Sequence, residues 1–296
     1  MVHYKNAGRT AFLIFNYLFL IVTALICLLP FINLLAISFS SSAAVSAGRV
    51  TFWPIDFTTM SYQFDLSGGK FLRSISVSIE RTILGVAVNL LFMILTAYPL
   101  SKTKSKVAGR NLYMTFFVIT MLINGGLIPS YLVVVKAGLR NSIWSLIIPG
   151  ALPVYNMIIL MNFMRGLPEE IEEAALIDGA SPIQVLIKVL LPILKPALAT
   201  VGLFCIVGHW NDWFGAMIYI DNPDKYPLQT YLQTMLLNFE QLMQRSGTDY
   251  TQLLALMNAR TGRAAQLFLG ALPIMLIYPF LQKYFTKGLV LGSVKG

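Results

Sequence analysis

Five neighbouring residues, His209 to Trp213, concentrate polar chemistry inside an apolar stretch. His209, Asn211 and Asp212 supply an imidazole, an amide and a carboxylate, and Trp210 and Trp213 flank them. Aromatic faces beside amides and carboxylates suit sugar rings and their hydroxyls. A charge at membrane depth costs about 2.5 to 3.5 kcal/mol and usually marks function. The alternative is an interfacial belt of tryptophans with Asp212 as a local cap, and both interpretations remain open.

The residues that enzymes and metal sites use are scarce. His209 and Asp212 would be neighbours on a helix, but the chain has only two histidines, and the acids converge at no single interface. Its two cysteines, Cys27 and Cys205, both lie in apolar segments, which argues against a disulfide framework or a Cys-ligated metal. No G-x-x-x-x-G-K-[ST] sequence occurs, so the chain has no phosphate-cradling loop of its own. We expect no catalytic residue, no metal and no bound cofactor.

Among the other amides in the apolar runs, three are candidates for a polar role. Asn124, in the break Asn124-Gly125-Gly126, is a second and weaker candidate for a substrate pathway. Asn89 and Asn156 could also bind substrate, but an interhelical hydrogen bond is the favoured interpretation for both.

The composition indicates an integral membrane protein. The chain has 296 residues, of which 56% are apolar and only 12% are charged, against about 25% charged in soluble domains. The net charge of +9 could suggest a nucleic-acid partner. We reject that interpretation, because the basic residues are spread through the loops between apolar runs, as membrane topology requires.

An all-α fold with six transmembrane helices is predicted from the apolar runs, each close to the roughly 20 residues that span a bilayer. The expected spans cover about residues 11–38, 82–100, 112–135, 143–163, 197–220 and 264–285. The first run is too long for a signal peptide and is interpreted as a retained span.

Charge predicts the orientation. Three segments that lie on one side of a six-span chain, namely the N-terminal tail, the connection between the second and third spans and the C-terminal end, carry basic residues and no acid. These basic residues are Lys5, Arg9, Lys102, Lys104, Lys106, Arg110, Lys283, Lys287 and Lys295. The positive-inside rule places that side, with both termini, in the cytoplasm. The expected location is therefore the bacterial cytoplasmic membrane, crossed several times.

Two outer segments complete the predicted organisation. Residues 40–79 suit an ordered loop, and residues 221–263 contain one helix face formed by Leu228, Leu232, Met235, Phe239 and Leu242. That face either packs on the outer ends of the spans or contacts a ligand or partner. We divide the chain into residues 1–74, with the first span and outer loop, and a five-helix core, residues 75–296.

The segment 168–192 is a polar hairpin between the fourth and fifth spans. Pro168 and four glutamates suit the first turn of a helix, and Asp178-Gly179 suits its end. Ser181, Pro182 and Gln184 then form a capping box that starts a second helix. Ala174 and Ala175 offer a slim surface for close approach by another protein. A merely solvated connection is the alternative, although it would not need two caps and a tight turn.

The hairpin resembles the EAA loop of permease subunits of ATP-binding-cassette importers. The matching residues are Glu173-Ala174-Ala175, Gly179, Val189 and Leu191-Pro192, with Val189 where the family has Ile. Residues 126–153 (GLIPSYLVVVKAGLRNSIWSLIIPGALP) are similar to carbohydrate-uptake permeases, of the maltose-type second subunit above all. Residues 209–232 (HWNDWFGAMIYIDNPDKYPLQTYL) resemble a branch that takes up complex oligosaccharides.

The resemblance implies a set of partners. These are a second homologous permease, two ATPase subunits that hold the ATP and magnesium, and an extracytoplasmic sugar-binding protein that delivers an oligosaccharide. It also implies that a coupling helix faces the ATPase, with Glu173, Ala174, Ala175, Asp178, Gly179 and Pro192 as the coupling residues. His209, Trp210, Asn211, Asp212, Trp213 and Asn124 are then the candidates for the substrate pathway.

Two other classes of protein are alternatives. A secondary transporter driven by an ion gradient would use intramembrane ionisable residues and broken helices, and Asn124-Gly125-Gly126 offers such a break. However, no inverted repeat is visible, and the capped hairpin would be unexplained. A membrane-bound transferase would need converging acids or histidines, which the sequence lacks.

Overall fold

A computed structural model describes residues 7–67, 69–103, 105–245, 260–273, 275, 276 and 279. All regular structure in these ranges is helical, as the sequence predicts. The chain divides into two compact units, Met1–Gly69 with Thr234–Leu272, and Lys70–Gln233 with Pro273–Gly296. Each unit is described by itself below.

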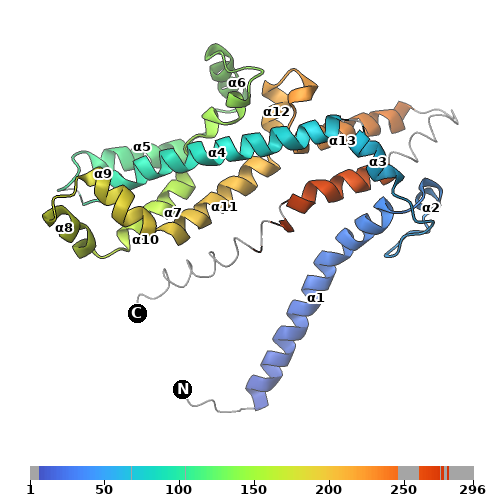
Figure 1. The fold of residues 1–296 in the computed structure, drawn as a ribbon, viewed down its shortest axis with the longest axis horizontal. Helices are drawn as coiled ribbons and strands as arrows, with labels where there is room; N and C mark the ends of the chain where they lie inside the picture. The colour runs from blue at the N-terminus through green and yellow to red at the C-terminus, as the bar shows by residue number, and fades with distance from the viewer. Residues whose placement is uncertain are drawn as a thin grey trace. The chain divides into compact units, whose positions relative to one another are not determined.

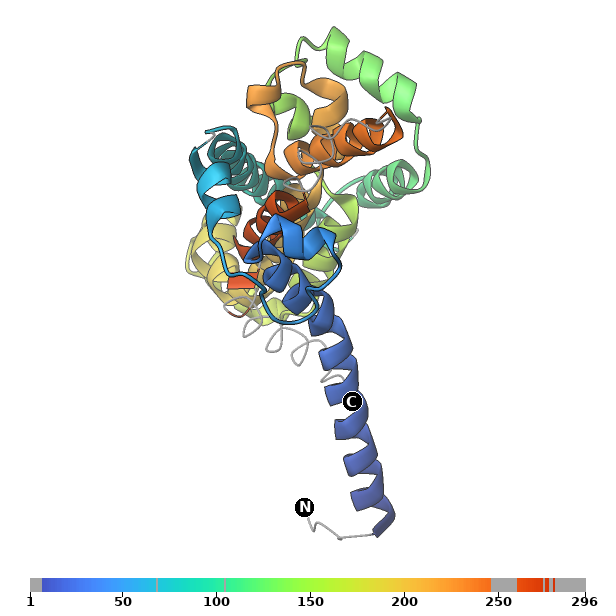
Figure 2. The same cartoon turned by 90° about the vertical axis from the view of Figure 1, so that its right-hand side faces the viewer.

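The first unit is dominated by one long apolar helix. Helix α1 (Ala7–Ser38) is continuous despite Pro30, as Figure 2 shows in blue. Residues 8–32 are exposed except Asn16, whereas the last turns are half-buried or buried. A helix that is apolar all round needs lipid or another chain around it. The short helices α2 (Ser42–Ser46) and α3 (Met60–Ser67) follow. Residues 260–273 are also helical, and the hydroxyls of Ser42 and Thr261 lie 3.3 Å apart.

The second unit carries most of the elements. Its longer helices are α4 (Lys70–Ser101), α5 (Arg110–Leu122), α6 (Leu127–Lys136), α7 (Val154–Arg165), α8 (Glu169–Ile177) and α11 (Lys195–Asn211). Shorter turns connect them: η1 (Ile143–Leu146), η2 (Ile148–Gly150), α9 (Pro182–Gln184), the π-helical η3 (Val185–Leu190), α10 (Leu191–Ile193), α12 (Phe214–Tyr219) and η4 (Pro223–Lys225). Helix α13 (Leu228–Arg245) begins in this unit.

The core of the second unit lies between α4, α7 and α11, which run side by side (Figure 1). Met93 and Ala97 of α4, Met157 and Leu160 of α7, and Val201 of α11 are fully buried there. Small residues such as Ala97 let membrane helices approach closely, and dispersion contacts then hold them together.

Two of the described helices, Gly8–Ser38 and Lys70–Ser101, are long and apolar enough to cross a membrane alone. Three bent pairs bring the described total to as many as five: Arg110–Leu122 with Leu127–Lys136, Ile143–Gly150 with Val154–Arg165, and Pro182–Ile193 with Lys195–Asn211. The predicted sixth span, residues 264–285, lies partly outside the described residues. The count of six and the cytoplasmic termini stay predictions.

The predicted break in the third span is confirmed. Helix α5 ends at Leu122, α6 begins at Leu127, and the two axes differ by 115°. Gly126 has φ +87°, a conformation that favours glycine. Its N–H donates to the Asn124 side chain over 2.9 Å.

The fourth and fifth predicted spans are each interrupted, which the sequence analysis did not indicate. The fourth bends by 50° before Pro153, because proline restricts the residue before it and lacks an N–H donor. The fifth stops at Asn211 and resumes at Phe214, with Asp212 as the extended residue that ends α11. Each break leaves backbone groups that need partners.

The second span begins earlier than expected. Residues 70–79 were assigned to an outer loop, but α4 starts at Lys70, because Phe71, Ser74, Ser78 and Arg81 form one buried helix face.

The predicted helix in residues 221–263 is confirmed as α13. Its Leu228 is fully buried and donates its backbone N–H to the Ser78 hydroxyl over 2.7 Å.

Candidate functional site

The polar hairpin has both predicted caps. Helix α8 ends at Ile177, and Gly179 follows with φ +82°, which suits a glycine at a helix C-terminus. The Ser181 hydroxyl accepts from the Gln184 N–H, and the Gln184 side chain accepts from the Ser181 N–H over 2.9 Å. This reciprocal capping box starts the second arm. The hairpin is therefore a defined turn rather than a loose connection.

The coupling candidates divide between exposed and packed positions. Glu173, Ala174, Asp178 and Gly179 are exposed. Ala175 is half-buried and packs against the core of the second unit. The side chain of Ile177, by contrast, is 85% exposed. Leu176 beside it is 44% exposed, and neighbouring exposed apolar residues suit contact with another protein.

One carboxylate fastens α8 to the end of α4. Glu172 accepts a hydrogen bond from the Tyr98 hydroxyl over 3.1 Å and pairs with the Lys102 ammonium. The side chains of Lys102 and Glu172 are each only 15% exposed, so solvent screens this pair less than a surface pair. The ammonium also lies 4.3 Å from the centre of the Tyr98 ring. The same hydroxyl lies 3.3 Å from the carbonyl of Pro182, on the second arm.

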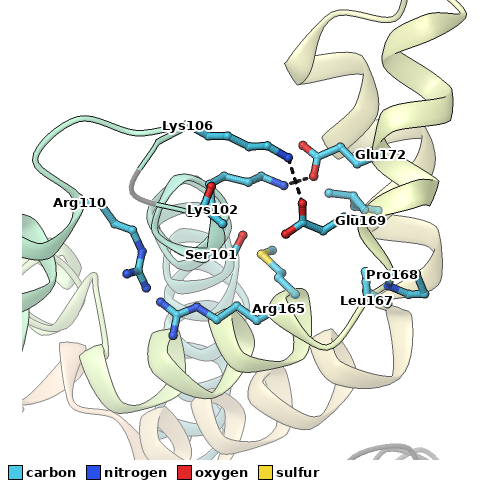
Figure 3. A pocket seen from close by; sticks show the side chains of 12 residues that line it. Ser101, Lys102, Lys106, Arg110, Arg165, Leu167, Pro168, Glu169 and Glu172 are labelled. Atoms are coloured by element: carbon cyan, nitrogen blue, oxygen red, sulfur yellow. Dashed lines mark hydrogen bonds and ion pairs between the residues drawn. The ribbon is translucent and has the colours of Figure 1, made fainter.

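A second, more exposed contact reinforces this one. The Lys106 ammonium lies 3.2 Å from a carboxylate oxygen of Glu169 and 4.0 Å from one of Glu173. The Glu169 hydrogen bond and charge raise the pKa of Lys106. Figure 3 shows Lys102 and Lys106 pointing together toward Glu169 and Glu172. The basic connection after α4 thus holds the acidic start of α8.

Pro192 lies at the end of the second arm, away from α8. It sits in α10, directly after the π-helical turn η3, and the chain then bends by 82° into α11. A proline inside a helix cannot donate to the carbonyl four residues earlier and clashes with it, and a wider π turn accommodates that conflict. We therefore interpret Pro192 as a residue that shapes the hairpin.

The second candidate site is a cavity of about 390 Å³ in the second unit. Residues from α4, η1, η2, α7, α11 and α12 line it, and its polar side chains are Arg81, Asn89, Ser145, Asn156, His209, Asp212 and Tyr219. Phe204 adds an aromatic side chain. Amides, a hydroxyl and aromatic rings in one pocket suit recognition of a polar ligand.

Arg81 neutralises the carboxylate at the break between α11 and α12. Its side chain is 2% exposed, donates to the Asp212 carbonyl over 2.9 Å and pairs with the Asp212 carboxylate. The other carboxylate oxygen accepts from the Gly215 N–H over 3.2 Å. One arginine therefore satisfies the end of a broken helix and balances the charge beside the cavity, as buried charges require.

Asn89 ties a second break to α4 and α11. Its amide nitrogen donates to the carbonyls of Gly150 and Ala151 over 2.8 and 2.9 Å, so its oxygen is the acceptor. His209 Nε2 lies 2.8 Å from that oxygen, and therefore donates from Nε2. Asn156 of α7 donates to the Cys205 sulfur of α11 over 3.6 Å. The expected interhelical hydrogen bonds of Asn89 and Asn156 are thus confirmed, although both also line the cavity.

The structure brings only part of the predicted pathway together. His209 and Asp212 line the cavity, whereas Trp210 is buried beside it without lining it. Asn211 is exposed, and Trp213 packs edge-on against Phe214 with 5.5 Å between ring centres.

Two residues differ from the expectation for the pathway. Asn124 lies exposed in the turn between α5 and α6 and does not line the cavity. Arg81 does line it, but sequence reasoning missed it, since the predicted outer loop ended at residue 79 and the predicted second span began only at Thr82. The signal was available: Ser74, Ser78 and Arg81 recur at steps of four and three, which places them on one helix face.

The chain is similar to known transport proteins. Residues 90–290 match the family described as binding-protein-dependent transport system inner membrane component. Protein LplC of Bacillus subtilis (strain 168) is 42% identical over 296 residues, which covers 100% of this chain and 98% of the relative. The polygalacturonan/rhamnogalacturonan transport system permease protein YtcP of the same strain is 37% identical over 95% of this chain and 96% of its own.

A solved structure is also similar. It is the crystal structure of a bacterial ABC transporter involved in the import of the acidic polysaccharide alginate, with a TM-score of 0.85 and 32% identity. The match covers 96% of this chain and 100% of that chain.

We predict that Gly85→Ala disturbs the cavity wall. An added Cβ would lie 2.4 Å from His209 Nε2, and the ring is held by Asn89. Overpacking of this kind costs about 1 to 3 kcal/mol, which exceeds the roughly 0.5 to 1 kcal/mol that alanine gains over glycine in a helix. The midpoint of thermal unfolding, measured on the purified chain in detergent, should therefore fall.

Gly202→Ala in α11 is the matched control, because a Cβ there meets no atom within 4 Å. Its unfolding midpoint should stay the same or rise. Equal midpoints for the two variants would contradict the contact between His209 and α4.

Proposed function

The chain belongs to the family of inner membrane components of binding-protein-dependent transport systems, and we propose that it is one of two permease subunits of an oligosaccharide importer. In this proposal it crosses the bacterial cytoplasmic membrane six times, with both termini in the cytoplasm. A second homologous permease lies beside it, two ATPase subunits dock on the cytoplasmic side, and an extracytoplasmic sugar-binding protein delivers the ligand. Hydrolysis of magnesium ATP takes place in the ATPases.

The observation that carries the proposal is that α8 is exposed on one side and fastened on the other. Ala174 and Ile177 are free to enter a cleft of an ATPase, with Glu173, Asp178 and Gly179 around them. On the inner side Glu172 joins α8 to α4, while Ala175 packs on the core. A tether would need none of these inner contacts.

The mechanism follows from that attachment. When the two ATPases close on ATP, they displace α8, and the contacts of Glu172 with Tyr98 and Lys102 pass the displacement to α4. The bend at Pro192 passes it to α11. Because α4, α7 and α11 share one core, they move as one body, which corresponds to domain rotation in other switching proteins. The cavity between these helices then changes its access.

The proposal also includes the chemical class of the transported oligosaccharide. YtcP is a permease for polygalacturonan and rhamnogalacturonan, and the solved relative imports alginate, so oligomers of acidic sugars are the first candidates. Asp212 alone would repel such a ligand, but Arg81 neutralises it. In the cavity we assign ligand contacts to His209 and Asp212, with Asn89 and Asn156. Trp210, Asn211, Trp213 and Asn124 do not line this cavity, and we place them along the route to it.

A gradient-driven transporter would use α8 differently. It would need no docking surface for an ATPase, and the exposed Ile177 and the caps of the hairpin would serve no purpose. Membership of a binding-protein-dependent family favours the ATP-driven importer. We therefore retain that proposal alone.

We predict that Ile177→Asp weakens binding of the ATPase subunit to the permease pair. Full burial of an isoleucine side chain contributes about 1.5 to 3 kcal/mol, so the affinity should fall by about tenfold or more. Copurification and a binding titration of the ATPase in nanodiscs would measure it. The conservative Ile177→Val removes one methylene, about 0.8 kcal/mol, and should weaken binding by no more than about fivefold. Unchanged affinity in Ile177→Asp would exclude α8 as the docking helix.

The substrate class is tested with the complete importer in liposomes. A panel of acidic oligomers, from polygalacturonan and alginate, and neutral maltooligosaccharides is added with the binding protein. We expect at least one oligosaccharide to stimulate ATP hydrolysis, with the acidic oligomers strongest. Uptake driven by an ion gradient without ATP would overturn the importer. Stimulation by neutral oligomers alone would overturn only the acidic preference.

A further inference from the structure

A second cavity, of about 410 Å³, lies where the ends of α4 and α7 and the start of α5 meet α8. Figure 3 shows it from close by. Four cationic side chains line it, Lys102, Lys106, Arg110 and Arg165, together with the two carboxylates of Glu169 and Glu172. The lining therefore has a formal charge of two positive units, and the cations are not equivalent.

The two lysines are already balanced. Lys102 pairs with Glu172, and Lys106 lies 3.2 Å from Glu169. These pairs belong to the attachment of α8 described above and form the acidic wall of the cavity. They leave the excess positive charge on the opposite wall.

The opposite wall carries two arginines that share one acceptor. Arg110 Nε donates to the Leu100 carbonyl over 2.8 Å, and Arg165 Nη2 donates to the same oxygen over 3.0 Å. Arg110 also donates to the Asn111 side chain over 3.2 Å. Neither arginine has a carboxylate within ion-pair distance among the residues that the structure describes. One neutral oxygen thus holds two like charges side by side, which repel each other.

Each guanidinium keeps donors beyond these bonds. An arginine has five N–H donors in a fixed fork, and the bonds to Leu100 and Asn111 occupy few of them. Arginine forks match the spacing of phosphate oxygens, and such charge-assisted bonds are about twice as strong as neutral ones. A phosphate between Arg110 and Arg165 would balance their two positive charges. Its oxygens would accept hydrogen bonds from the N–H groups of both side chains at the cavity.

We propose that Arg110 and Arg165 bind the phosphate group of an anionic phospholipid at this cavity. The cavity lies at the ends of α4 and α7, which are membrane-crossing segments in the proposed topology, and this is the level of the cytoplasmic headgroups. Basic pockets between transmembrane helices on that side bind anionic headgroups. The lipid phosphate joins the ends of α4, α5 and α7 directly beneath α8, and so stiffens the base on which the coupling helix rests.

The test uses the complete importer in nanodiscs of phosphatidylcholine with or without phosphatidylglycerol. Native mass spectrometry counts the phosphatidylglycerol molecules that stay bound. The double variant Arg110→Gln/Arg165→Gln should retain phosphatidylglycerol at least about tenfold more weakly, the loss expected for charged hydrogen-bonding groups. Arg140→Gln is the matched control, because Arg140 is exposed elsewhere and pairs with Asp221 over 2.8 Å. It should retain the lipid as the wild type does.

A folding defect is separated from a binding defect in two ways. The unfolding midpoint is recorded for each variant, and Arg110→Lys/Arg165→Lys keeps both charges but not the forks. If the site binds phosphate, the lysine variant retains more phosphatidylglycerol than the glutamine variant and less than the wild type. Equal retention by wild type and glutamine variant would overturn the proposal. The proposal would also be overturned if the glutamine variant no longer bound the ATPase subunit but retained phosphatidylglycerol as the wild type does. That result would assign the two arginines to a protein interface.

A titration with inorganic phosphate tests whether the bound phosphate group belongs to a lipid or to a free ion. In nanodiscs of phosphatidylcholine alone, phosphate is titrated against the wild type and the glutamine variant. We expect no arginine-dependent binding of free phosphate, because a soluble ion lacks the anchoring of the acyl chains. Arginine-dependent binding of free phosphate without retention of phosphatidylglycerol would overturn the lipid assignment.

Discussion

The contact between Glu172 and the end of α4 is the interaction on which the rest of the account depends. A short helix of nine residues is marginal in water, so α8 needs tertiary contacts to keep one position. Tyr98 near the end of α4 and Lys102, the residue that follows α4, supply them, and both reach the same carboxylate. Without this contact the hairpin would still be capped at both turns and joined to α11 through the bend at Pro192, but in the proposed mechanism its motion would no longer pass directly to α4.

Inside the core the governing constraint is that charge and broken backbone must be satisfied within the chain, because lipid cannot do so. The helical structure is interrupted at two places next to a polar side chain of α4: Arg81 at the break after α11, and Asn89 at the break before α7. The continuous helix thus holds the two interrupted ones. The same arrangement leaves His209 and Asp212 facing a cavity with their charges and donors already ordered, which suits recognition rather than catalysis.

Sequence reasoning succeeded where local chemistry decides. The caps at Gly179 and Ser181 depend on residues within four positions of one another, and so does the break at Asn124. It failed where distant contacts decide. The spacing of Ser74, Ser78 and Arg81 indicated one helix face, but nothing near Arg81 in the sequence indicated its partner Asp212, which lies 131 positions later. The polar stretch from Lys70 onward therefore looked like a loop. The bends of the fourth and fifth spans depend likewise on partners supplied by α4. The family was recognised from the hairpin, whose spacing is local.

The central claim is that α8 and α4 move together, and one distance measures it directly. Spin labels at Glu170→Cys on α8 and Ile79→Cys on α4, in a chain with Cys27→Ser and Cys205→Ala, would be read by double electron–electron resonance in the assembled importer. Both positions are exposed. The account predicts the same distance distribution without nucleotide and with ATP trapped by vanadate, while Glu172→Gln broadens it. If the distance distribution of the labelled chain that keeps Glu172 shifted between the two nucleotide states, this would contradict transmission through Glu172.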